Sequence, residues 1–236
     1  MPKSSTVDPS AEFATLLRGE SATISAWSEQ RNTRRLAAHF AIIIMGAGCY
    51  GAAMGWWRAP QQALLVAIKL PLIILLTTLG NALINGMLAP LLGLNIPFRQ
   101  SFSAIVMSFA TTAAILGAFS PPIAFVVWNA PALGSPAATS ATYSFIMLTH
   151  VAAIAVAGIA GNVRLFQLLA HWGNSRAVAQ RVLFAWLAGN LILGSQLAWN
   201  LRPFIGAPLL PVEFFRANAF RGNFFEAVWG SLRQLF

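Results

Sequence analysis

The run PLIILLTTLGNALINGMLAPLL, residues 71–92, decides the fold class because it holds 22 consecutive residues without a charged side chain. About 20 predominantly apolar residues are enough for a helix to cross the hydrocarbon core of a bilayer. The surrounding chain extends this pattern, since no aspartate or glutamate lies between Glu29 and Glu213. Ten lysines and arginines fall in the same interval. A chain that lacks acidic residues over most of its length is not expected to face water there.

Composition leads to the same class. The chain has 236 residues, of which 57% are hydrophobic and 9% are charged, whereas soluble domains carry about 25% charged residues. We therefore predict an all-α, polytopic membrane helical bundle. The net charge of +9 fits basic residues at membrane ends and contact with membrane lipids. The basic residues are scattered, so we expect no nucleic-acid partner.

Apolar runs predict about five transmembrane helices, with interfacial amphipathic helices beside them. The spans are expected at 36–57, 71–92, 101–120, 141–162 and 182–199. Residues 58–70 are too short and interrupted to cross, and we interpret them as an interfacial helix. Pro71 then opens the second span, while Ser120-Pro121-Pro122 ends the third. Residues 123–140 are expected to form an external loop.

Three regions follow from these spans. They are a polar cytoplasmic N-terminal tail (1–34), a five-span transmembrane domain (35–200) and an external tail (201–236). Within the external tail, Asn223 and Glu226 resemble a capping box that opens an amphipathic helix over 223–236. Seven basic residues near span ends lie on the side of the N-terminus, against four on the other side. This bias favours a cytoplasmic N-terminus and a periplasmic or external C-terminus. The expected location is the inner membrane of a bacterial cell.

Small residues recur on the first span. Ala47, Gly51 and Gly55 lie at i, i+4 and i+8, and Gly51 with Gly55 forms a GxxxG pattern. Small residues allow helix backbones to approach closely in lipid. This glycine face is predicted to pack against another helix of the chain, with an oligomer contact as the alternative.

Polar residues within the spans form a second group, the polar seam. Its members are Thr77, Asn81 and Asn85 on the second span, and Asn190, Gln196 and Asn200 on and just after the fifth. An unpaired amide in lipid costs several kcal/mol, so these groups must face protein or water. Hydrogen bonding between helices is the structural interpretation, and a polar path for a solute is the functional one.

His150 lies near the middle of the fourth span. A histidine there either bonds within the bundle or binds a metal, a pigment or a lipid group. The chain shows no catalytic motif and no paired acids, so we expect no enzymatic activity. The sequence assigns no cofactor.

Charged residues return at the outer side. Lys69 and Arg202 are expected there together with Glu213 and Glu226, the two acids predicted on that side. Ion pairs among them would fasten the tail to the bundle. The alternative is an anion site for a lipid phosphate.

Two strings resemble an uncharacterised family of bacterial polytopic membrane proteins. One is KLPLIILLTTLGNALINGMLAPLLG (69–93), in which Lys-x-Pro opens a span. The other is AWNLRPFIGAPLLPVEFFRANAFRGNFFEAV (198–228), which carries Trp-x-Leu-Arg-Pro-Phe-x-Gly-x-Pro and Asn-Phe-Phe-Glu-Ala. The resemblance implies no activity. The five-span plan is also similar to Yip1-type proteins, which are non-enzymatic trafficking factors.

The absence of catalytic chemistry predicts a non-catalytic subunit or scaffold of a larger membrane assembly. Its contacts would use the tail and the glycine face, and its partners would be other membrane subunits or a second copy. One alternative is a carrier or flippase component for an anionic lipid or solute. The other is a pigment- or haem-binding subunit that uses His150.

Overall fold

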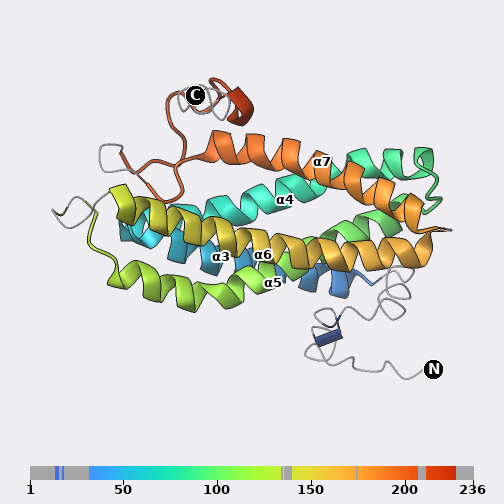
Figure 1. Ribbon diagram of the computed structural model, residues 1–236, viewed down its shortest axis with the longest axis horizontal. Helices are drawn as coiled ribbons and strands as arrows, with labels where there is room; N and C mark the ends of the chain where they lie inside the picture. The colour runs from blue at the N-terminus through green and yellow to red at the C-terminus, as the bar shows by residue number, and fades with distance from the viewer. Residues whose placement is uncertain are drawn as a thin grey trace.

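Five long helices make up most of the described chain. The computed structural model describes residues 14, 15, 18, 32–133, 135, 140–173, 175–206 and 211–226. The helices are α3 (Thr33–Trp56), α4 (Pro60–Leu91), α5 (Phe98–Asn129), α6 (Ser140–Trp172) and α7 (Arg176–Leu201) (Figure 1). All five are long and apolar enough to cross a membrane. The predicted all-α multi-pass membrane bundle is therefore confirmed.

The helix N-termini are set by ordinary capping chemistry. The Asn32 side chain accepts a hydrogen bond from the Arg35 amide at 3.0 Å and opens α3. The Ser175 side chain accepts one from Val178 at 3.3 Å and opens α7. Such caps satisfy amides that have no partner within the helix. Pro60 begins α4, at a position where its missing amide hydrogen costs nothing.

The bundle is built around α3. This helix packs against both α4 and α5, while α6 packs on α5 and α7 packs on α4. In Figure 1, α6 and α7 lie in front of the other three helices. The contact between α6 and α7 is smaller than these other contacts, and this difference shapes the candidate site described below.

The separate interfacial helix predicted over 58–70 is wrong, because residues 60–70 form the first part of α4. Pro71 lies inside this helix rather than at its start. Helix-interior prolines are tolerated in membranes where neighbouring groups compensate for the lost hydrogen bond. Two polar residues of this segment, Gln62 and Lys69, are fully buried in protein.

The predicted helix end at Ser120-Pro121-Pro122 is also wrong. Both prolines lie inside α5, which continues to Asn129, so residues 123–129 belong to a helix and not to a loop. Ser120 donates a hydrogen bond to the carbonyl of Leu116 at 3.3 Å. α6 and α7 likewise extend past their predicted boundaries, to Trp172 and back to Arg176 respectively.

The helices are longer than a bilayer requires. A helix of 32 residues, such as α4, spans about 48 Å at 1.5 Å per residue, against a hydrocarbon core of about 30 Å. Tilt or extension past the hydrocarbon accommodates the difference. Hydropathy alone therefore predicted spans that are shorter than the observed helices.

The described part of the tail lies against the end of α7 (Figure 1). The Glu226 amide donates to the Asn223 side chain at 2.8 Å, as the predicted cap requires. Residues 224–226 are helical. The remainder of the helix predicted over 223–236, and nearly all of the N-terminal tail predicted over 1–34, lie outside the described residues.

Candidate functional site

An amide cluster of Asn81, Asn85 and Asn190 joins α4 to α7. Asn85 Nδ2 donates to Asn81 Oδ1 at 2.7 Å. Asn81 Nδ2 donates to Asn190 Oδ1 and also lies 3.4 Å from the carbonyl oxygen of Trp186. Asn81 and Asn85 are almost completely buried, and each is paired with another amide as burial in an apolar bundle demands.

Glycines on α7 allow this close approach. A Cβ atom at Gly189 would lie 2.6 Å from Asn81 Oδ1, and one at Gly194 would lie 3.7 Å from Thr77 Oγ1. The structure thus brings together four members of the polar seam, Thr77, Asn81, Asn85 and Asn190. The other two are paired separately, with Gln196 donating to Asn200 at 3.1 Å.

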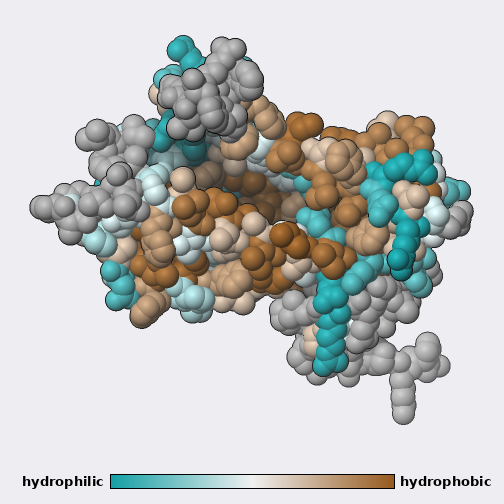
Figure 2. All heavy atoms as spheres, viewed as in Figure 1, coloured by the Kyte–Doolittle hydropathy of each residue, from teal (hydrophilic) through white to brown (hydrophobic). Residues whose placement is uncertain are grey.

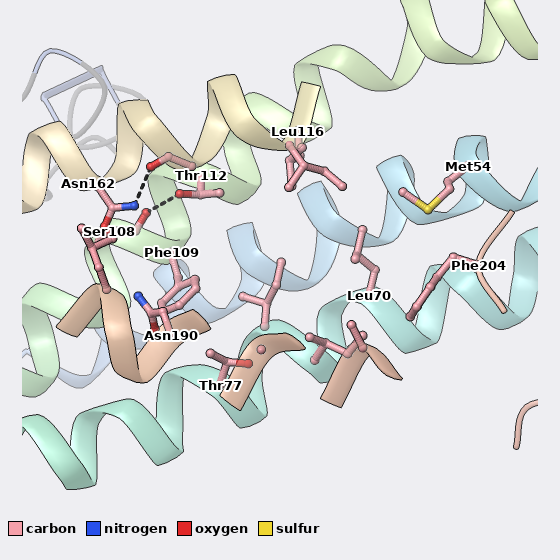
Figure 3. Close-up of a pocket in the computed structure, with 17 residues that line it drawn as sticks. Met54, Leu70, Thr77, Ser108, Phe109, Thr112, Leu116, Asn162, Asn190 and Phe204 are labelled. Atoms are coloured by element: carbon pink, nitrogen blue, oxygen red, sulfur yellow. Dashed lines mark hydrogen bonds between the residues drawn. The ribbon is translucent and has the colours of Figure 1, made fainter. Parts of the chain in front are cut away.

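A lateral cavity of about 390 Å³ lies beside the amide cluster (Figure 3). All five helices contribute to its lining. The apolar part consists of Met54, Leu70, Ile73, Ile74, Phe109, Leu116, Ile154, Leu187, Ala198 and Phe204, with Gly158 and Gly194. The polar part consists of Thr77, Ser108, Thr112, Asn162 and Asn190, and no lining residue is charged.

The α5–α6 side of the polar wall is largely satisfied within the protein. Ser108 donates to the carbonyl of Gly161 at 3.1 Å, and Thr112 donates to the carbonyl of Ser108 at 3.1 Å. Asn162 Nδ2 donates to the carbonyl of Gly158 at 2.8 Å. Figure 3 shows Ser108, Thr112 and Asn162 gathered at one end of the cavity, with Met54 and Phe204 at the other.

The cavity opens sideways. Figure 2 shows the surface hollowed between α6 and α7, with hydrophobic residues around the hollow. These two helices are also the least covered of the five within the protein. Because their outer surfaces face lipid in a membrane-spanning bundle, the opening leads to the bilayer interior.

Lys69 and Gln62 fasten the tail to the N-terminal part of α4. The Lys69 side chain is fully buried, and its Nζ donates to the main-chain carbonyls of Glu213 at 3.0 Å and Pro203 at 3.4 Å. The ring of Phe214 lies 5.4 Å away. Gln62 Nε2 donates to the carbonyls of Pro203 and Phe204. Lys69 thus holds the tail through main-chain carbonyl oxygens, including that of Glu213, whereas the sequence suggested ion pairs with carboxylates.

Arg202 adopts a different role from Lys69. Its guanidinium stacks on the Trp199 ring at 3.4 Å and donates to the Trp199 carbonyl. Burial lowers the pKa of Arg202, and the positive charge of Arg216 lowers it further. The fourth predicted member of this group, Glu226, is the last of the described helical residues 224–226 and donates its amide to the Asn223 side chain.

His150 is buried against Tyr50. The Tyr50 hydroxyl and His150 Nδ1 lie 3.0 Å apart, while His150 Nε2 is buried without a hydrogen-bond partner among the described residues. Neither side chain lines the lateral cavity. In the part of the chain that the structure describes, no three His, Cys, Asp or Glu residues are grouped to hold a metal ion.

The glycine face contacts α4 of the same chain. A Cβ atom at Gly51 would lie 2.5 Å from the Val66 carbonyl oxygen, and one at Gly55 would lie 2.7 Å from that of Gln62. Ala47 is fully buried. This face is therefore used for packing within the bundle.

Sequence reasoning missed several residues of the cavity. Ser108, Thr112 and Asn162 were not singled out, although each is a polar residue within an apolar span. Nothing in the sequence pointed to Gly158, because its importance depends on the empty space beside it, which only the structure shows. Comparison with known protein families, with curated proteins and with solved structures finds no match.

Proposed function

We propose that this integral membrane protein is non-catalytic, binds a lipid in the lateral cavity and acts as a carrier component. The observation that supports the proposal is the opening of the cavity between α6 and α7 toward the bilayer interior. A ligand that enters there must already be dissolved in the membrane. The cavity volume of about 390 Å³ falls within the usual range for ligand pockets, about 300–1,000 Å³.

The lining is suited to an amphipathic molecule. Apolar side chains cover most of the wall and match a hydrocarbon chain, while five polar side chains offer hydrogen bonds. The interval between Glu29 and Glu213 contains no carboxylate, so a pair of acids for proton transfer cannot be built within the spans. Binding without chemistry is the function that this combination supports best.

The other functions expected from the sequence find less support. A scaffold would need free contact surfaces, whereas the glycine face packs on α4. In the tail, Pro203 and Glu213 are held by Gln62 and Lys69. A pigment or haem would need a suitable space beside a histidine nitrogen. His150 Nε2 has no hydrogen-bond partner among the described residues, but His150 does not line the cavity.

Filling the cavity tests the proposal. Gly158 lines it, and a Cβ atom there would have no neighbour within 4 Å. We expect Gly158→Leu to fold normally and to occupy the space that the lipid needs. Ala155→Leu is the matched control, because Ala155 is exposed on the same helix and is not part of the lining.

Native mass spectrometry of the purified protein, released from mild detergent, provides the measurement. The natural chain and Ala155→Leu should retain a bound lipid, and Gly158→Leu should lose it while its thermal unfolding stays unchanged. Equal lipid retention by all three proteins would contradict the proposal.

A further inference from the structure

The hydrogen-bond donors of the cavity can be assigned from the amide cluster. A main-chain carbonyl only accepts hydrogen bonds, so the contact with the Trp186 oxygen fixes the nitrogen of Asn81 on that side. Asn81 Nδ2 then also donates to Asn190 Oδ1. This leaves Asn190 Nδ2 for the cavity, and Figure 3 shows the nitrogen on the side of α5 and the oxygen on the side of α4.

Thr77 supplies a second hydrogen-bonding group, its side-chain hydroxyl. Its side chain lines the cavity, is only 3% exposed, and its Oγ1 has no hydrogen-bond partner among the described residues. Neighbouring hydroxyls behave differently. Thr78 and Thr111 donate to the carbonyls four residues earlier, at 2.6 and 3.0 Å. A buried hydroxyl without a partner is costly, so a hydrogen bond from Thr77 to a ligand would be favourable.

These two groups lie close together along the cavity wall. Thr77 faces Gly194 across the α4–α7 contact, and Asn81, one turn further along α4, faces Asn190. Asn190 and Gly194 are themselves one turn apart on α7. An amide N–H and a hydroxyl thus lie about one helical turn apart on the α4–α7 wall of the cavity, and each can donate to an acceptor.

The absence of charge in the lining restricts the ligand further. A phosphate or carboxylate in this apolar space would require a cation to offset its lost hydration, and no lining residue is charged. Lys69 precedes the lining residue Leu70, but its ammonium group is engaged by the carbonyls of Pro203 and Glu213. An anionic headgroup is therefore unsuited to this site.

We propose that the lateral cavity binds an uncharged long-chain lipid through carbonyl oxygens that accept hydrogen bonds from Asn190 Nδ2 and Thr77 Oγ1. This inference rests on the proposed lipid-binding function and narrows it to neutral carbonyl lipids. Two sources share this chemistry, the ester carbonyl of a diacylglycerol and the ring carbonyl of an isoprenoid quinone. The rest of the molecule would leave through the opening between α6 and α7.

Photoaffinity labelling tests the inference. The full-length protein is placed in phosphatidylcholine nanodiscs with one of three diazirine-bearing probes: a diacylglycerol, an isoprenoid quinone or the anionic phosphatidylglycerol. Labelled α6 and α7 peptides are quantified by mass spectrometry. We expect at least one neutral probe to label the cavity more strongly than phosphatidylglycerol, and the stronger neutral probe identifies the source of the carbonyl.

Thr77 variants examine the hydrogen bond itself. Thr77→Val keeps the shape but removes the hydroxyl, and should weaken labelling by the neutral probe about tenfold, as expected for the loss of one hydrogen bond. Thr77→Ser retains the hydroxyl and should restore labelling. Both variants should unfold at the temperature of the natural chain, which separates lost binding from lost structure.

The outcomes separate the two proposals. If Gly158→Leu blocks labelling while phosphatidylglycerol labels as well as the neutral probes and Thr77→Val has no effect, lipid binding stands and the neutral carbonyl assignment is overturned. If Gly158→Leu leaves labelling of α6 and α7 unchanged for all three probes, both proposals fail.

Discussion

At the scale of single residues, Lys69 shows how main-chain carbonyls hold a buried ammonium group. Its ammonium group has three hydrogen-bond donors, of which two are taken by the carbonyls of Pro203 and Glu213. The Phe214 ring at 5.4 Å lies within the range of a cation–π interaction. Main-chain dipoles and an aromatic face thus replace the water that the charge lost.

Replacing Lys69 with methionine should release the segment that follows α7. Lys69→Met leaves the Pro203 and Glu213 carbonyls without this donor, and we expect a loss of about 1–3 kcal/mol in the free energy of unfolding. Limited proteolysis should then cut within residues 203–216 more rapidly than in the natural chain. Arg176→Met, which removes one positive charge from an exposed site, serves as the control. Equal protease resistance of both variants would show that Lys69 does not hold the tail.

At the scale of helices, α3 and α4 approach so closely that side chains are excluded between them. A Cβ atom at Gly51 would lie 2.5 Å from the Val66 oxygen, whereas one at Gly48 would lie 3.4 Å from the Ala67 oxygen. Backbone atoms cannot move aside as a flexible side chain can. The same substitution should therefore have opposite effects at two positions one turn apart.

The two alanine variants test this packing. Gly51→Ala should force the helices apart and destabilise the protein by about 1–3 kcal/mol, as overpacking generally does. Gly48→Ala should be neutral or stabilise by up to about 1 kcal/mol, because alanine favours helix over glycine. Thermal unfolding in detergent measures both. A Gly51→Ala variant with unchanged stability and a smaller oligomer would instead place the glycine face between copies of the chain.

The helices also show what sequence can and cannot predict. Hydropathy predicted five spans, and the spacing of Asn81 and Asn85 predicted one polar face. The sequence interpretation misplaced the start of α4 and the end of α5, because Pro71 and Pro121 were taken as helix boundaries. Proline stops a helix in water, where its lost hydrogen bond is not compensated, but neighbouring helices compensate in a membrane bundle. The partner of Lys69 was equally hidden, since the sequence shows acids and does not show which carbonyls the fold presents.

At the scale of the whole molecule, basic residues are distributed between the two ends of the bundle. Arg35, at the start of α3, and Arg176, at the start of α7, share one end, and Arg58 and Arg202 share the other. The sequence places seven basic residues on the N-terminal side against four on the other, which favours a cytoplasmic N-terminus. Orientation matters for function because Ser108 and Asn162 lie in the half of the cavity nearer the α3 N-terminus. With this end inside, the polar wall lies toward the cytoplasmic leaflet.

Cysteine labelling in spheroplasts should reveal this orientation. Cys49 is the only cysteine, so a Cys49→Ser background permits single substitutions at exposed alanines at each end, Ala177→Cys near the start of α7 and Ala217→Cys in the tail. A membrane-impermeant maleimide should modify Ala217→Cys in intact spheroplasts, and Ala177→Cys only after permeabilisation. The matched alanine substitutions leave the charge balance that directs insertion unchanged. The reverse labelling pattern would invert the orientation and place the polar wall of the cavity toward the external leaflet, so that lipid would be drawn from that side.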